Sequence, residues 1–396
     1  MNAMDIMEKA LAAHEEWGGK LNITSRVKIQ DQDALSVAYT PGVARPCLEI
    51  QKNPSLSYDL TMRNNLVAVI TDGTAVLGLG DIGPLAAMPV MEGKCALFSE
   101  FAGVNAFPLC VNTKDPDEFC KSVALIAGSF GGINLEDISA PRCFEIEQKL
   151  KKMVDIPVFH DDQHGTAVVA SAAILNSCKL AGKQPSDLRV VINGAGAAGV
   201  AIAKMLMNIG VKDILMLNSK GIVCEGDKLS SEALTELSKV TNREHLHGGL
   251  ADAMKGADVF IGVSKPNLVT PEMIHSMNEK PFIFAMANPT PEIMPDLAKE
   301  AGAFVVGTGR SDFPNQINNV LAFPGIFKGA LSVRSSDITE GMKMAAANAI
   351  ANCVSDDQLS PECVIPNPFD PKVSAAVAEA VAAAAIKDGV ARICNA

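Results

Sequence analysis

One stretch of this sequence constrains the fold more than any other, because it leads from an apolar run through a glycine fingerprint into a helix. The run is Leu188-Arg189-Val190-Val191-Ile192-Asn193, whose β-branched side chains are typical of a buried parallel strand. It is followed by Gly194-Ala195-Gly196-Ala197-Ala198-Gly199 and by a periodic apolar stretch from Val200. This order predicts a dinucleotide-binding unit. The first glycine makes the turn, the second admits a pyrophosphate, and the third lets the helix pack on the strand.

The sequence around the fingerprint alternates between strand and helix patterns, which predicts an α/β protein with a doubly wound parallel sheet. The expected segments are 168–181, 188–193, 197–209, 213–217, 231–239, 258–263, 282–287 and 303–307. Upstream, apolar strands are expected at 66–70 and 106–111. A chain of 396 residues exceeds a single core. We expect an N-terminal α/β substrate domain over 1–157 and a Rossmann-type dinucleotide-binding domain over 158–396, with an alanine-rich helix at 373–386 that packs back.

Charge, apolar runs and cysteine spacing exclude several classes of protein. The 34 basic and 45 acidic residues give a net charge of −11 without a basic stripe, which argues against a nucleic-acid partner. No apolar run is long enough to span a bilayer, and the amphipathic segment 4–17 lacks the features of a signal peptide. Ten cysteines are scattered without CxxC spacing, as free thiols in a reducing compartment would be. We therefore expect a cytoplasmic enzyme with no membrane partner.

Two acidic pairs, Glu136-Asp137 and Asp161-Asp162, lie upstream of the fingerprint. Hard divalent cations prefer carboxylate oxygens that converge from different loops. Alone, each pair is more typical of a helix N-terminus than of a metal site; together with the fingerprint they favour a Mg²⁺ or Mn²⁺ site. His160 and His164 flank the second pair, but an oxygen-preferring cation makes them more typical of hydrogen bonds within the turn.

The strand expected at 213–217 ends in Asn218-Ser219-Lys220. An acidic residue at this position usually binds both ribose hydroxyls and repels a 2′-phosphate. Asn218 removes that charge and Lys220 adds a cation nearby, so the sequence favours NADP over NAD. If Lys220 is only a solvated loop lysine, NAD remains open.

Six motifs in order resemble those of malic enzymes, the metal-dependent decarboxylating malate dehydrogenases. They are Tyr39-Thr40-Pro41-Gly42-Val43, Thr71-Asp72-Gly73, Gly78-Leu79-Gly80-Asp81, Met91-Glu92-Gly93-Lys94, the segment 160–166, and Ala287-Asn288-Pro289-Thr290. The likeness runs from about residue 20 to the C-terminus, and the length resembles the short, prokaryotic-type subclass. It implies oxidative decarboxylation of L-malate to pyruvate and CO₂, with reduction of NADP or NAD.

The resemblance also implies three catalytic roles. Lys94 is the base that takes the proton of the C2 hydroxyl, Asp161 pairs with this lysine, and Tyr39 is the acid that protonates C3. A lysine base needs a lowered pKa, which burial or an adjacent cation can provide. A phenol suits the acid because it is protonated at neutral pH.

By the same resemblance, Glu136, Asp137 and Asp162 are the metal ligands. Asn288 and Asn319 are expected at the substrate, with Asn288 also beside the cofactor. Amide groups can hold a carboxylate without adding charge.

One feature departs from the larger malic enzymes, whose corresponding loop carries an arginine that clamps a substrate carboxylate. Here the loop reads Asp72-Gly73-Thr74-Ala75, with Ala75 in place of the arginine. We expect Thr74 and nearby backbone N–H groups to substitute for it.

The resemblance implies a homodimer in which the Tyr39 segment reaches the partner's site. Two other functions remain open from the sequence. A metal-independent amino-acid dehydrogenase also places a lysine before a nucleotide domain, and it differs in being insensitive to chelators. A non-catalytic nucleotide-sensing protein is disfavoured because it has no physical need for Tyr39, Lys94 and three acidic ligands together.

Overall fold

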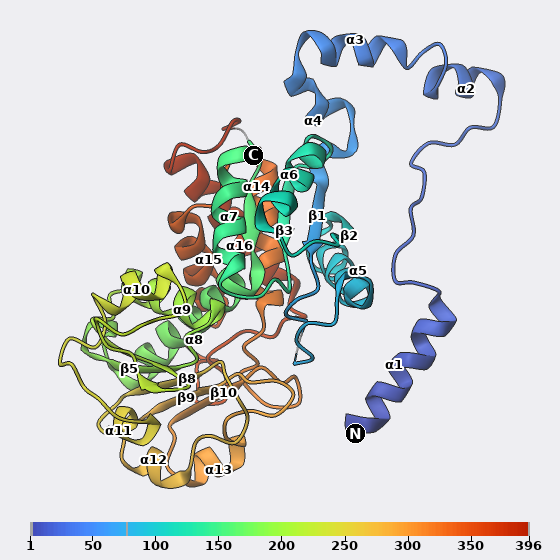
Figure 1. Ribbon diagram of the computed structural model, residues 1–396. Helices are drawn as coiled ribbons and strands as arrows, with labels where there is room; N and C mark the ends of the chain where they lie inside the picture. Colours follow the sequence, from blue (N-terminus) through green and yellow to red (C-terminus); the bar gives the residue numbers. More distant parts are fainter. Residues whose placement is uncertain (1–2, 77, 395–396) are drawn as a thin grey trace.

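The computed structural model describes residues 3–76 and 78–394, which form two β-sheets surrounded by helices (Figure 1). The first sheet has the strand order β2-β1-β3-β4, and all its pairings are parallel. Its strands are β1 (Leu66–Thr71), β2 (Asn105–Cys110), β3 (Gly132–Leu135) and β4 (Val158–His160). Helices α5 (Pro84–Ala102), α6 (Pro116–Ile126) and α7 (Arg142–Met153) connect them. The two sheets thus part at His160, shortly after the domain boundary expected at 157–158.

The second sheet has the order β10-β9-β8-β5-β6-β7, which is the doubly wound arrangement expected from the sequence. Its strands are β5 (Arg189–Asn193), β6 (Asp213–Asn218), β7 (Gly221–Ile222), β8 (Val259–Gly262), β9 (Phe282–Ala285) and β10 (Val305–Thr308). All pairings are parallel except that of β7 with β6. Its helices are α9 (Ala197–Asn208), α10 (Glu232–Ser238), α11 (Leu250–Met254), α12 (Pro271–His275) and α13 (Pro295–Glu300).

Strand β1 shows why apolar runs without alternation form this sheet. Val67 and Val69 face a core shared with α5, whereas Ala68 and Ile70 face a second core shared with α6 and α7. Because successive side chains point to opposite faces, a strand covered on both sides must be apolar at every position.

Helix α8 (Asp161–Ala181) joins the two halves of the molecule. It begins at the end of β4 and packs along α9 of the second sheet. Its small side chains, such as Ala167, Ala170 and Ala173, are fully buried in the core that the two halves share. The first turn of α8 is therefore fixed relative to the second sheet, because the same helix packs in both halves.

Three C-terminal helices complete the fold: α14 (Phe323–Ser332), α15 (Glu340–Asn352) and α16 (Pro371–Lys387). Helix α16 packs on α14 and α15, which confirms the expected helix at the C-terminal end. Helix α14 lies on the first sheet, since a Cβ added at Gly132 of β3 would lie 3.0 Å from the ring of Phe327. The Phe98 and Phe323 rings also meet edge to face at 4.7 Å. The last helices therefore cover the first sheet, although they follow the second in sequence.

An N-terminal arm, residues 3–60, extends away from both sheets (Figure 1). It holds α1 (Ala3–Trp17), α2 (Gln32–Ala38), α3 (Ala44–Lys52) and α4 (Ser57–Leu60). Large apolar side chains lie in solvent along it, with Ile23 85% and Val37 77% exposed. The backbone N–H of Lys20 donates to Glu92 of α5 at 3.0 Å, which ties the arm to the body. None of the described helices has the length and apolar character needed to cross a membrane.

Candidate active site

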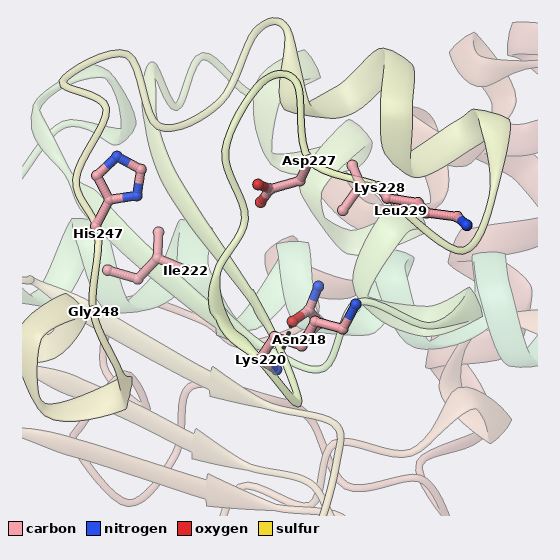
Figure 2. Close-up of a pocket in the computed structure, with 8 residues that line it drawn as sticks. All are labelled: Asn218, Lys220, Ile222, Asp227, Lys228, Leu229, His247 and Gly248. Carbon is pink, nitrogen blue, oxygen red and sulfur yellow. Dashed lines mark hydrogen bonds between the residues drawn. The ribbon is translucent and has the colours of Figure 1, made fainter.

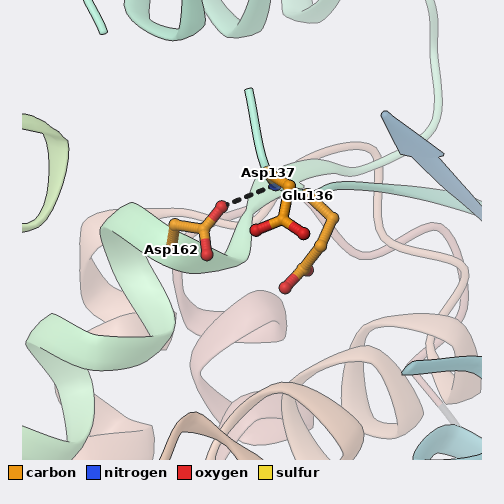
Figure 3. A group of neighbouring side chains, drawn as sticks. All are labelled: Glu136, Asp137 and Asp162. Atoms are coloured by element: carbon orange, nitrogen blue, oxygen red, sulfur yellow. Dashed lines mark hydrogen bonds between the residues drawn. The ribbon is translucent and has the colours of Figure 1, made fainter. Parts of the chain in front are cut away.

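Three carboxylates converge where two neighbouring strands of the first sheet end (Figure 3). Glu136 and Asp137 follow β3, and Asp162 lies in the first turn of α8, directly after β4. One oxygen from each side chain lies within 4.8 Å of the others. Asp137 has a φ of 53°, and its N–H donates to Asp162 Oδ2 at 2.8 Å. The strand ends thus bring together the three residues that the sequence suggested as metal ligands.

Lys94 of α5 reaches the same cluster. Its Nζ lies 2.6 Å from Asp161 Oδ2 and 2.8 Å from Glu136 Oε1. It also lies 4.2 Å from the centre of the Phe323 ring. Only 7% of the lysine side chain is exposed. An ammonium with two carboxylate partners in a buried setting is held in a single orientation.

The titration behaviour of this group differs from the sequence expectation. Burial alone would lower the pKa of Lys94, but the charges of Asp161 and Glu136 outweigh it and the pKa is raised. Burial in turn raises the pKa of Glu136 to about 7 and that of Asp161 to about 7, against the influence of Lys94. Burial also raises the pKa of Asp162 to about 6. A neutral lysine therefore requires that its carboxylate partners first take a proton or bind another cation.

A pocket of about 750 Å³ lies over this cluster and extends to the second sheet. Asn288, past the end of β9, and Asn319 both line it, as the sequence suggested. The Asn319 side-chain amide also donates to Asp161 Oδ2. Ser264, past β8, lines the pocket too and was not singled out from the sequence. A signal for it existed, since ligands bind where the strands of such sheets end.

Thr74 does not line the pocket, whereas its neighbour Ala75 does, so the structure gives no support to the expected contact of Thr74 with a substrate. The Thr74 hydroxyl donates to Asp72 Oδ1 at 2.6 Å and accepts from the Ser139 N–H at 3.0 Å and from Arg142 at 2.8 Å. With these three bonds the hydroxyl braces the loop and has no capacity left for a substrate.

The fingerprint has the geometry that its glycines predict. Gly194 has a φ of 129°, and α9 begins at Ala197 immediately after Gly196. A Cβ added at Gly199 would lie 1.8 Å from the Gly194 carbonyl oxygen, whereas one added at Gly196 meets nothing within 4 Å. Gly199 thus serves helix packing, and Gly196 leaves open the space in front of the helix N-terminus, where phosphates bind. Ala198 lines the pocket over the carboxylates; Ala195, between Gly194 and Gly196, is a partly buried residue packed against the main core.

A second, smaller pocket of about 260 Å³ lies at the end of β6 (Figure 2). Asn218 and Lys220 line it, together with Lys228 and His247. The Lys220 N–H donates to Asn218 Oδ1 at 2.8 Å, which fixes the turn. Lys228 and His247 were not expected from the sequence, because loops far from the fingerprint bring them here.

Tyr39 is the one expected catalytic residue that the structure keeps apart from the rest. It lies at the end of α2 in the N-terminal arm, is 66% exposed, and does not line the pocket. The part of the arm that carries α2 lies away from α5 and from both sheets of its own chain (Figure 1).

The two histidines beside the acidic pair differ in their surroundings. His164 Nε2 lies 2.9 Å from both carboxylate oxygens of Glu147 on α7, and its Nδ1 lies 3.2 Å from Lys343 Nζ on α15. The Glu147 carboxylate also accepts the His160 N–H at 3.3 Å. This network joins α7, α8 and α15 around the first turn of α8, and sequence reasoning missed its two partners from distant helices.

A doubly wound sheet facing a buried lysine and a cluster of carboxylates defines a class of protein: a two-domain dehydrogenase that uses a nicotinamide dinucleotide. Two family models match the chain, "Malic enzyme, N-terminal domain" over residues 18–151 and "Malic enzyme, NAD binding domain" over residues 163–386. The chain belongs to the malic enzyme family and is an NAD- or NADP-dependent enzyme of that family.

Individual relatives agree with this assignment. The chain is 57% identical over 391 residues to the bifunctional malic/malolactic enzyme of Bacillus subtilis, covering 98% of this chain and 95% of that protein. It is 47% identical over 405 residues to the NADP-dependent malic enzyme of Escherichia coli, covering 98% of this chain and 53% of that protein. The crystal structure of the NAD-dependent malic enzyme of Thermotoga maritima superimposes with a TM-score of 0.91 at 50% identity, covering 94% and 98% of the two chains.

We predict that two alanine substitutions in the fingerprint separate folding from nucleotide binding. Gly199→Ala should lower the free energy of unfolding by about 3 kcal/mol, because its Cβ meets the Gly194 carbonyl. Gly196→Ala should change it by less than about 0.5 kcal/mol yet weaken nucleotide binding, because the new methyl group lies where the pyrophosphate approaches. Urea unfolding and calorimetric nucleotide titration measure the two effects. Equal destabilisation by both substitutions contradicts this division of roles.

Proposed function

We propose that this protein catalyses the oxidative decarboxylation of L-malate to pyruvate and CO₂, with reduction of NADP and with a divalent cation, Mg²⁺ or Mn²⁺. The observation that carries the proposal is the contact of Lys94 with Glu136 and Asp161 beside three convergent carboxylates, in a pocket that reaches the nucleotide-binding sheet. A base, a cation site and a hydride acceptor are the three things that this reaction needs in one place.

The donor set fits a hard cation. Glu136, Asp137 and Asp162 offer carboxylate oxygens only, and two of them have raised pKa values because they are buried close together. A divalent cation bound there supplies positive charge beside the substrate's C2 oxygen, during both oxidation and loss of CO₂.

The chain's own residues then move the protons. Lys94 takes the proton of the C2 hydroxyl while hydride leaves C2 for the nicotinamide. Asp161, 2.6 Å away with its pKa raised by burial to about 7, is placed to exchange a proton with the lysine. After CO₂ leaves C3, the enolate needs a proton at C3, and Tyr39 supplies it. Asn288 and Asn319 orient the substrate through their amides.

Preference for NADP rests on the pocket at the end of β6. Asn218 brings no negative charge to the ribose, and both Lys220 and Lys228 line the same pocket. Two ammonium groups favour a 2′-phosphate over a bare hydroxyl. Asp227 also lines this pocket, and its negative charge disfavours a 2′-phosphate. Its carboxylate accepts the Cys224 N–H at 2.9 Å, however, and so holds the turn.

Tyr39 reaches a site only if the partner subunit of a homodimer provides it. Most of the large apolar side chains of the arm that carries Tyr39 are exposed in its own chain, with Tyr58 as a buried exception, and such surface is stabilised by contact with another copy. We therefore infer that each site combines Lys94 of one subunit with Tyr39 of the other.

The reaction and its cation dependence are tested together. Malate-dependent reduction of NADP should stop in a chelator and return with Mg²⁺. Asp162→Asn should weaken Mg²⁺ binding on the order of 100-fold by calorimetry, because it removes one of three charged ligands.

Lys94→Ala should lower kcat on the order of 10³-fold, with exposed Lys114→Ala as the control. Full activity in the chelator contradicts the proposal and favours a metal-independent dehydrogenase.

Nucleotide preference has its own measurement. Lys220→Gln should raise the KM for NADP about tenfold and leave the KM for NAD unchanged, because only NADP carries the 2′-phosphate. Lys204→Gln, on the exposed side of α9, is the matched control. An equal rise for both nucleotides means that Lys220 does not contact the phosphate.

Sharing of the site between subunits is tested by mixing two inactive variants. Tyr39→Phe and Lys94→Ala homodimers each lack one group in every site. After dissociation and random reassociation, the mixed dimer has one intact site, so about one quarter of wild-type activity should return. If Tyr39 serves its own chain, no activity returns, since every site then still lacks one group.

A further inference from the structure

The large pocket lacks a cation for one end of the substrate. Lys94 is the only basic side chain among the described residues that line the pocket, and it is already bonded to Asp161 and Glu136. The same lining includes three carboxylates, so a divalent cation there only neutralises the lining residues. Malate brings two further negative charges, and Ala75 and Thr74 offer nothing to balance them. An additional cation is therefore required near the mouth of the pocket.

Arg310 is the candidate for this cation, because it lies next in the chain to a residue that lines the pocket. It follows Gly309, which lines the pocket at the end of β10, and β10 pairs with β9, whose end leads to Asn288. The two strand ends approach closely, since a Cβ added at Gly309 would lie 2.8 Å from the Asn288 amide nitrogen. The Arg310 Nη1 donates to the carbonyl oxygen of Pro289 at 3.2 Å, which places the guanidinium beside the substrate asparagine.

The other edge of the Arg310 guanidinium already holds a carboxylate. Nε and Nη2 form a bidentate pair with Asp312 at 2.8 and 2.6 Å. Asp312 is only two residues away and 57% exposed, and Arg310 is 32% exposed. A local pair in solvent contributes little to stability, so another carboxylate can replace Asp312 in the same geometry at small cost.

We propose, on the basis of the function proposed above, that Arg310 exchanges Asp312 for the substrate and binds the malate carboxylate that remains in pyruvate. The chemistry selects this carboxylate. A cation that grips the departing carboxylate stabilises its negative charge, which must be lost as CO₂ forms and the C3–C4 bonding pair moves into the C2–C3 bond, and so opposes loss of CO₂. The neutral amides of Asn288 and Asn319 suit the departing end, and Arg310 suits the end that stays.

The test compares removal of the same ion pair from either side. Arg310→Gln should raise the KM for malate on the order of 10- to 100-fold with kcat changed less than about threefold, because a bidentate charge-assisted contact is lost. Asp312→Asn breaks the same pair but leaves the guanidinium free, so its KM should stay equal or fall. Arg310→Lys keeps the charge without the fork and should lie between wild type and Arg310→Gln.

Pyruvate distinguishes the two ends of the substrate. Its inhibition constant as a product should rise in Arg310→Gln by a factor similar to that of the malate KM, while the KM for NADP stays unchanged. Equal losses in Arg310→Gln and Asp312→Asn mean that the pair only braces the loop, and an unchanged pyruvate constant means that Arg310 does not hold the retained carboxylate. Either result overturns the inference. Failure of the wild-type enzyme to oxidise malate overturns the proposed function instead.

Discussion

The bonding of Lys94 to Asp161 and Glu136 is the interaction on which the rest of the site depends. Taking an ammonium and two carboxylates out of water is costly, and only their mutual attraction with good geometry offsets it. The three groups come from α5, from the start of α8 and from the end of β3. Each of these elements must therefore be in place before any of the charges is tolerated, and the site cannot form in part.

The second requirement is that two sheets present their strand ends to one pocket. The ends of β3 and β4 carry the acids, and the ends of β8, β9 and β10 lead to Ser264, Asn288 and Gly309. Helix α8 begins among the acids and packs on α9 behind the nucleotide fingerprint. Because α8 packs in both halves, the angle between the halves sets the distance between the carboxylate cluster and the nucleotide-binding sheet.

Much of this could be predicted from the sequence, and the reason is that the informative patterns are local. The strands of the second sheet, the turn at Gly194 and the close packing at Gly199 follow from residues close together in the chain. The set Glu136, Asp137 and Asp162 was identified through the family resemblance, and its role as a metal site stays a prediction. The hydrogen bonds that Thr74 accepts were not foreseen, because its partners, Ser139 and Arg142, come from another loop. Glu147 and Lys343 went unnoticed for the same reason, since helices α7 and α15 meet only in the folded protein. The family resemblance supplied Tyr39 and its place at a partner's site, and this role stays a prediction. Arg310 went unnoticed because the pairing of β10 with β9 brings it near Asn288.

The placement of α14 has a consequence for how the chain acquires its structure. One face of the first sheet is closed in part by Phe323 and Phe327, which are synthesised after every strand of the second sheet. Part of the apolar surface of the early strands is consequently covered only when this distant helix has been made, although α5 packs on the same face earlier. Such contacts of large sequence separation make folding slow and leave the nascent polypeptide open to aggregation. The strands of the first sheet are thus synthesised early, but part of their packing forms late, after α14 has been made.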